Sequence, residues 1–220
     1  KLAWPEKPRF SWLLRLRLMR PVPSGATRAG AGWPTDPTLG ETVRDLGSCT
    51  VGLIGYGNIA KRVETIVTAM GATVVHTNTR GAQGHPGWRS LPDLLTTSDV
   101  VSLHLPLTEH TEGLLDTAAL GLMKPGAVLV NTSRGAVIDE AALVSALQNG
   151  PLQAAGLDVF ATEPVDPGNP LLALDNVVVS PHTTWYTADT MRRYLAEAVG
   201  NCERLAAGQP LANVVNEVNL

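Results

Sequence analysis

From residue 50 onward the sequence alternates short apolar runs with longer amphipathic stretches, and this alternation limits the chain to few folds. The apolar runs predict strands over residues 50–54, 73–77, 100–105, 127–131, 153–158 and 176–180. The stretches between them predict helices over residues 58–70, 91–97, 116–123 and 139–149. Strands and helices that alternate in this way form parallel sheets covered by helices. We therefore predict an α/β fold of the Rossmann type, with a doubly wound parallel sheet.

A glycine-rich turn joins the first predicted strand to the first predicted helix. It reads Gly55-Tyr56-Gly57-Asn58-Ile59-Ala60, a form of the dinucleotide fingerprint GxGxxG/A. Gly55 permits a tight turn, and Gly57 lets the backbone approach a pyrophosphate. Free amides at the helix start, where Asn58 and Ile59 lie, add partial positive charge. The turn therefore predicts a site for NAD or NADP.

The end of the second predicted strand lacks the acidic residue that usually binds the ribose 2′-hydroxyl of NAD. The sequence there is His76-Thr77-Asn78-Thr79-Arg80. Without a carboxylate, the loop at Asn78 does not repel a 2′-phosphate, and the Arg80 guanidinium can bind one through two parallel N–H bonds. We predict a preference for NADPH over NADH. The alternative is that Arg80 only caps a solvated loop.

Three later motifs each bring one charged or titratable side chain just beyond a predicted strand. Arg134 lies in Asn-Thr-Ser-Arg-Gly, Glu163 follows Gly-Leu-Asp-Val-Phe, and His182 ends Ser-Pro-His. Because ligands of open α/β sheets collect at the carboxyl ends of the strands, we expect these groups to meet around one small substrate. Histidine can donate a proton near neutral pH, a carboxylate can orient it, and arginine can bind an anionic group.

The glycine turn followed by these three motifs resembles the D-isomer-specific 2-hydroxyacid dehydrogenases, and the resemblance runs from about Arg28 to Val215. It implies hydride transfer between NAD(P)H and a small 2-keto acid or D-2-hydroxy acid. It places Arg134, Glu163 and His182 in the family's catalytic positions. Further cofactor-binding positions that it implies are Leu105, Pro106, Thr111, Thr132, Ser133, Asp158 and Thr184. Asp158 is expected to accept from the nicotinamide carboxamide, and Trp185 to form a wall of the substrate pocket.

The resemblance also divides the chain into three parts. Family members carry a substrate-binding domain ahead of the nucleotide-binding domain, and we expect residues 1–45 to be a remnant and linker of it, with a helix over 10–20. Residues 46–187 are the predicted NAD(P)-binding domain, and residues 188–220 a C-terminal helix and tail that return to the substrate-binding domain. The alternative function is that of a catalytically weak cofactor-binding or dimerising remnant.

The amino-acid composition limits the classes of partner that we expect this chain to bind. The 17 basic and 20 acidic residues give a formal charge of −3, which does not favour nucleic acid, and no apolar run reaches the roughly 20 residues of a membrane span. Two distant cysteines, Cys49 and Cys202, fit a reducing cytoplasm. We therefore expect a cytoplasmic protein, and the family resemblance implies a homodimer that acts on a small molecule.

Two further classes are not supported by the spacing of residues. The remaining histidines do not form a ligand cluster with metal-site spacing, so we predict no metal. These are His76, His85, His104 and His110. Short-chain dehydrogenases need a tyrosine followed four residues later by lysine, and none of the three tyrosines has one.

Overall fold

The computed structural model describes residues 44–81 and 85–214. Contacts divide the chain into two compact units between His182 and Thr183. The predicted helix over residues 10–20 and residues 1–43 of the predicted remnant lie outside the described residues.

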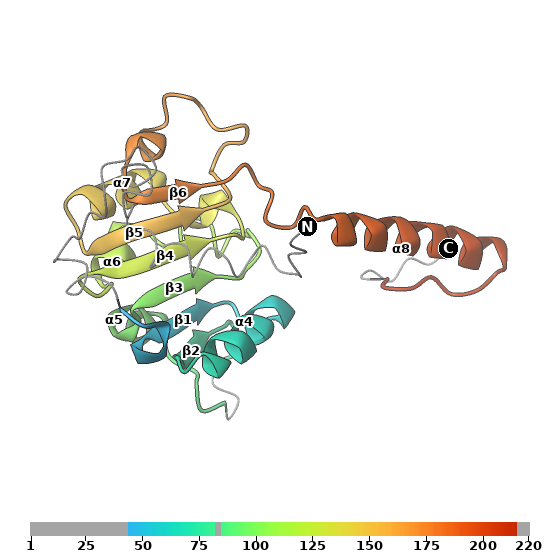
Figure 1. The fold of residues 1–220 in the computed structure, drawn as a ribbon, viewed down its shortest axis with the longest axis horizontal. Coiled ribbons are helices and arrows are strands. Elements are labelled where there is room, and N and C mark those ends of the chain that lie inside the picture. The colour runs from blue at the N-terminus through green and yellow to red at the C-terminus, as the bar shows by residue number, and fades with distance from the viewer. Residues whose placement is uncertain (1–43, 82–84, 215–220) are drawn as a thin grey trace, which may run out of the picture. The chain divides into compact units, whose positions relative to one another are not determined.

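The first unit contains a six-stranded sheet in which every neighbouring pair of strands is parallel (Figure 1). The strand order is β2-β1-β3-β4-β5-β6. The strands are β1 (Thr50–Ile54), β2 (Thr73–Thr77), β3 (Val100–Leu103), β4 (Ala127–Asn131), β5 (Leu152–Leu157) and β6 (Val177–Val179). The predicted Rossmann-type parallel sheet is therefore confirmed.

The order of the strands reverses beside β1. The chain runs from β1 outward to β2 and then returns to place β3 on the other side of β1. Ligands of open α/β sheets bind at such a switch point, outside the carboxyl ends of the strands. In the other half of the sheet, Asn131 pairs with both Leu103 and Leu157. Because these are the last residues of β4, β3 and β5, the three strands end in register and their following loops begin side by side at the carboxyl edge.

Helices cover both faces of the sheet, and the strand side chains alternate between the two cores. Ala127 and Leu129 face the core that contains buried leucines of three helices, whereas Val128 and Val130 belong to the core under the first helix. The three helices of the first face are α5 (Leu91–Thr97), α6 (Thr117–Gly121) and α7 (Glu140–Gln148), and the opposite face carries α4 (Asn58–Ala69). Short 3-10 helices are η1 (Leu46–Ser48), η2 (Gly135–Val137) and η3 (Pro170–Ala173).

Some helices and strands end at residues other than the predicted ones. Asp116 does not belong to α6 but caps it, because its carboxylate accepts a hydrogen bond from the Ala119 amide at 2.8 Å. In the same way Asp139 lies outside α7 and caps it through the Ala142 amide. Strand β3 ends at Leu103 rather than at residue 105, because Leu103 pairs with Ile54 and Asn131, the last residues of the neighbouring strands β1 and β4.

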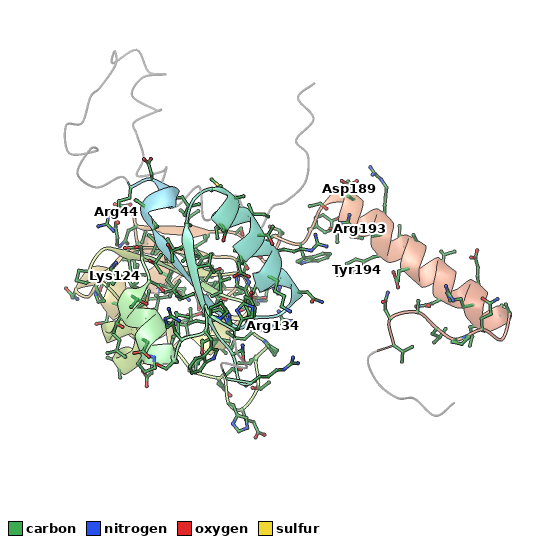
Figure 2. All side chains as sticks on the ribbon, turned by 90° about the horizontal axis from the view of Figure 1, so that it is seen from below. Arg44, Lys124, Arg134, Asp189, Arg193 and Tyr194 are labelled. Atoms are coloured by element: carbon green, nitrogen blue, oxygen red, sulfur yellow. The ribbon has the colours of Figure 1, made fainter. Side chains whose placement is uncertain are left out.

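At the amino end of the strands, Asp99 joins three groups. Its carboxylate accepts from Arg44 at 2.9 Å, from Lys124 at 2.8 Å and from the Thr50 amide at 2.8 Å. Burial by itself raises the pKa of Asp99, but the hydrogen bonds from Lys124 and Thr50 and the two positive charges outweigh it and hold the pKa below its ordinary value. Figure 2 shows Arg44 and Lys124 at the end of the sheet opposite to Arg134.

The second unit contains α8 (Ala188–Ala206), which Thr187 caps through the Thr190 amide. None of the α8 residues is buried. The Tyr194 ring lies 6.1 Å from the ring of Trp185, and Asn201 holds the backbone of Ala212 through both groups of its side-chain amide. Figure 2 labels Tyr194 together with Asp189 and Arg193 of the same helix. In the described part of the chain, no helix has the length and apolar character needed to cross a membrane.

Candidate active site and cofactor site

The amino end of α4 has no side-chain cap. Its N-cap residue is Gly57, which has no side chain to accept from the first amides of the helix. The other four α-helices in the described ranges all have a side-chain cap, supplied by Ser90, Asp116, Asp139 and Thr187. The amides of Asn58 and Ile59 are therefore left without a capping side chain, as phosphate binding at a helix start requires.

The two glycines of the turn have different physical roles. Gly55 has a φ of 87°, and a Cβ there would lie 2.5 Å from the carbonyl oxygen of His104, so neither the backbone conformation nor the space admits a side chain. Gly57 has a φ of −91°, and a Cβ there would meet no atom within 4 Å. Gly55 thus shapes the turn at the β1–β3 switch point, whereas Gly57 leaves space beside the helix start. This turn fits the pyrophosphate of a dinucleotide.

The predicted contacts to the adenosine ribose lie at the end of β2. The Asn78 side chain accepts a hydrogen bond from the Arg80 amide at 2.8 Å, which forms a tight turn. The Arg80 guanidinium is exposed and makes no hydrogen bond or ion pair with any residue in the described ranges. No acidic side chain follows β2 before residue 81.

An aromatic cluster that the sequence did not predict lies beside the turn. The Tyr56 ring stacks on the His76 ring with centroids 3.6 Å apart, and His76 Nε2 lies 3.0 Å from His85 Nδ1. The Tyr56 hydroxyl donates to Glu64 of α4. Burial, reinforced by the Glu64 carboxylate, raises the pKa of Tyr56 to about 12, and burial beside His85 lowers the pKa of His76. The cluster fixes the turn to both α4 and β2.

Buried Asn131 shapes the loop that carries Arg134. This last residue of β4 is 1% exposed, and its side-chain carbonyl accepts from the amide and the hydroxyl of Ser133, both at 2.9 Å. Its side-chain amide donates to the Arg134 carbonyl at 2.8 Å. The Arg134 guanidinium is therefore presented from a fixed backbone. The motif alone predicts no role for Asn131, and the signal for one is that this polar residue ends a buried strand.

Gly135 brings the Arg134 loop against the loop that follows β5. A Cβ at Gly135 would lie 1.9 Å from the carbonyl carbon of Phe160 and 2.3 Å from the amide nitrogen of Ala161. The two backbones are thus in direct contact, and only glycine allows it. Arg134 and the segment leading to Glu163 therefore belong to one packed arrangement.

Glu163 and His182, which the sequence was expected to bring together, lie within hydrogen-bonding distance of each other. His182 Nδ1 lies 2.8 Å from Glu163 Oε2, while Glu163 Oε1 accepts from the Phe160 amide at 3.0 Å. His182 has a φ of 51°, and its amide donates to the carbonyl of Asp158 at 2.8 Å. Burial raises the pKa of Glu163, but the hydrogen bonds from His182 and Phe160 outweigh it, so the net pKa is lowered.

This pairing fixes the chemistry of the imidazole. A carboxylate can only accept, so Nδ1 is the protonated nitrogen facing Glu163, and Nε2 is the atom that can give or take a proton. Both side chains are partly exposed, at 40% for His182 and 38% for Glu163, so a small molecule can reach them.

The other predicted positions differ in how they are engaged. Thr111 closes its own loop, since its hydroxyl donates to the Pro106 carbonyl and accepts from the Thr108 amide, both at 2.7 Å. Asp158 is 1% exposed and accepts from the Ser180 hydroxyl, so one oxygen of this carboxylate is already bonded. Leu105 and Thr132, which follow β3 and β4, lie at the carboxyl edge of the sheet. Thr184 and Trp185 belong to the second unit.

Across the described ranges, no group of three or more His, Cys, Asp or Glu side chains is arranged to hold a metal ion. The carboxyl edge of the sheet thus combines an uncapped helix start, an exposed arginine after β2, a second arginine after β4 and an ion-paired histidine after β6. Such a set can bind a dinucleotide and an anion and can transfer a proton.

Comparison with known proteins gives one consistent family. Residues 13–184 match the model of the D-isomer specific 2-hydroxyacid dehydrogenase, NAD binding domain. A glyoxylate reductase of Aeropyrum pernix is 39% identical over 94% of this chain, and the chain spans 65% of that protein's length.

Two solved structures are similar over the same share of the chain. A D-lactate dehydrogenase of Lactobacillus jensenii with NAD+ superposes with a TM-score of 0.80 at 28% identity, over 94% of this chain and 66% of its own. An acyclic imino acid reductase in complex with NADPH and D-Arg superposes with a TM-score of 0.82 at 32% identity, again over 94% and 66%.

Proposed function

The chain belongs to the D-isomer-specific 2-hydroxyacid dehydrogenase family through its NAD-binding domain, and from this premise we propose that it reduces a small 2-keto acid to the D-2-hydroxy acid with NAD(P)H. The observation that carries the proposal is the His182–Glu163 ion pair at the edge of the sheet where the cofactor turn also lies. The A. pernix relative is a glyoxylate reductase, which makes glyoxylate the first substrate to test.

Residues of the β1–α4 turn hold the cofactor in this proposal. The amides of Asn58 and Ile59 bind the pyrophosphate, and Gly57 leaves the space that the phosphate oxygens need. When bound, the nicotinamide supplies the hydride that reduces the keto carbon. Arg80 binds the 2′-phosphate of NADPH, because its guanidinium is exposed and the loop after β2 contains no competing carboxylate.

His182 and Glu163 supply the proton. In the reducing direction, protonated His182 donates from Nε2 to the keto oxygen, which becomes the hydroxyl of the product. Glu163 holds the ring through Nδ1 and stabilises the imidazolium before transfer. In the oxidising direction the same nitrogen accepts the hydroxyl proton.

Arg134 supplies the positive charge that an anionic substrate requires. Its guanidinium stays charged throughout the reaction and can bind a carboxylate with two parallel hydrogen bonds. The Asn131 contacts and the Gly135 backbone contact fix the loop from which it extends. A charge held in place in this way also stabilises negative charge that develops on the keto oxygen.

The experiment is to titrate the protein with NADPH by fluorescence and then add glyoxylate or hydroxypyruvate. The proposal requires both cofactor binding and substrate-dependent oxidation of NADPH. Replacement of Arg134 by lysine keeps the charge but removes the planar fork, so KM for the keto acid should rise while NADPH binding stays unchanged. Binding of NADPH without oxidation of any keto acid would instead support a cofactor-binding protein without turnover.

A further inference from the structure

The loop between β5 and η3 carries Glu163 and is held by few contacts of its own. Residues 161–164 and 166–168 are all exposed, and the side chain of this loop that packs against the core is that of Val165. Inside the loop, Asp166 accepts from the Gly168 amide at 2.7 Å, which forms a local turn but does not attach the loop to the sheet. The position of the Glu163 carboxylate therefore depends on the packing of Val165 and on how the two ends of this loop are attached.

One carboxylate on α7 attaches both ends. Glu140 Oε1 accepts from the Ala161 amide at 2.7 Å, and Glu140 Oε2 accepts from the Asn169 side-chain amide at 2.9 Å. Ala161 lies two residues before Glu163 and Asn169 six residues after it. The two partners are 21 and 29 residues away from Glu140 in sequence, so these contacts are tertiary.

The contacts of Glu140 are not needed to cap its own helix. Asp139 already accepts from the Ala142 amide as the N-cap of α7. Asn169 in turn caps η3, because its side-chain carbonyl accepts from the Leu171 amide at 2.9 Å. The orientation of the Asn169 amide group is thus set, and its NH2 group faces Glu140.

Two successive backbone amides connect Glu140 to the ion pair. The Phe160 amide donates to Glu163 and the next amide, of Ala161, donates to Glu140. The same two residues are those that the Gly135 backbone contacts. Any shift of this segment would move the Phe160 donor away from Glu163 and disturb the Glu163–His182 pair.

We propose that Glu140 is a positioning residue that holds both ends of the β5–η3 loop, so that Glu163 faces His182. Its consequence for turnover rests on the proposed reductase function, but the attachment itself does not. Glutamate is required because both partners are donors, whereas glutamine would present an NH2 group to one of them.

The test compares three variants by NMR titration of the Glu163 carboxyl group, which requires no turnover. In Glu140→Gln we expect the pKa of Glu163 to rise toward its ordinary value. The reason is that the hydrogen bonds from His182 and Phe160 to Glu163 are formed for a smaller fraction of the time than in the parent protein. Asn169→Asp alone should act in the same direction, because two carboxylates would face each other across 2.9 Å. The double variant Glu140→Gln with Asn169→Asp places an amide opposite a carboxylate and should restore the lowered pKa.

Asp139→Ala is the matched control. This substitution removes the N-cap of α7 at the residue before Glu140 but changes no contact of the β5–η3 loop. It should lower the free energy of unfolding and leave the pKa of Glu163 as in the parent protein. If Glu140→Gln does not fold, Asn169→Ser removes the amide donor while keeping an oxygen that can cap η3. This variant should give a smaller rise in the same direction.

Kinetic measurements separate this proposal from the proposed function. For Glu140→Gln we expect kcat for keto-acid reduction to fall by about 100-fold, with the Kd of NADPH unchanged. An unchanged pKa of Glu163 in a folded Glu140→Gln protein would overturn the positioning role. A shifted pKa in a protein that never reduces a keto acid would support the attachment and contradict the reductase function.

Discussion

His182 Nδ1 lies 2.8 Å from Glu163 Oε2, and the other oxygen of that carboxylate accepts from the Phe160 amide. The carboxylate is thereby fixed by donors on both sides, and His182 Nε2 is the ring nitrogen that does not face Glu163. In the proposed reaction His182 donates the proton and Glu163 orients it, and these contacts hold the two side chains in the arrangement that such roles require.

Replacement of His182 by glutamine should lower kcat for glyoxylate reduction by about 100- to 10,000-fold, the usual contribution of a general acid. Glu163→Gln should lower kcat by less, because the imidazole is kept and only its orientation and the stabilisation of the imidazolium are weakened. Steady-state oxidation of NADPH measures both effects. The Kd of NADPH serves as the control, and an undiminished kcat in His182→Gln would contradict the assigned role.

The choice of cofactor should depend on Arg80. We expect Arg80→Ala to weaken NADPH binding by about 10- to 100-fold, the range of a lost charge-assisted hydrogen bond, with little change for NADH. Asn78→Asp should favour NADH, since a carboxylate there repels the 2′-phosphate and can bind the 2′-hydroxyl. Arg62→Ala, a change of the same charge on the exposed surface of α4, is the control. Equal or better kcat/KM with NADH in the parent protein would reject the preference for NADPH.

Two glycines should respond to alanine in opposite ways. Gly57→Ala should leave stability nearly unchanged, because the added Cβ meets no protein atom, but it should weaken cofactor binding by filling the space of the phosphate. Gly135→Ala should cost several kcal/mol or prevent folding, since its Cβ would overlap the Phe160 carbonyl carbon. Thermal unfolding together with NADPH titration checks both. A stable Gly135→Ala protein would show that the two loops can separate.

The Asp99 cluster should make stability depend on pH. The pKa of Asp99 is lower when folded than its ordinary value of 3.8, so its contribution is fully present above that pH and is lost as the pH falls through the lowered pKa. Asp99→Asn should therefore cost about 2 kcal/mol at neutral pH, and the difference from the parent protein should shrink in acid.

Urea unfolding at several pH values measures this difference. Asp175→Asn is the control, because Asp175 is exposed and makes no ion pair in the described ranges. Its effect should stay below about 0.5 kcal/mol at every pH. A loss of stability in Asp99→Asn that does not change with pH would mean that packing, not charge, makes the contribution.

Sequence periodicity was sufficient for the elements and for the edge of the sheet at which the functional residues lie. A strand or helix is fixed by which neighbouring residues are apolar, and a motif directly after a strand reaches the carboxyl edge whatever the strand order. For this reason the Gly55 turn could be predicted, together with the edge of the sheet at which Arg134, Glu163 and His182 were expected.

Only the tertiary structure decided which distant groups hold the site together. The attachment of Glu140 to Ala161 and Asn169, the backbone contact of Gly135 with Phe160 and the stack of Tyr56 on His76 join segments that are about 20 or more residues apart. Such contacts depend on strand order and on the packing of whole loops, which the pattern of neighbouring residues does not encode. The sequence by itself therefore determined the chemical groups and their edge of the sheet, whereas their orientation was decided by non-local packing.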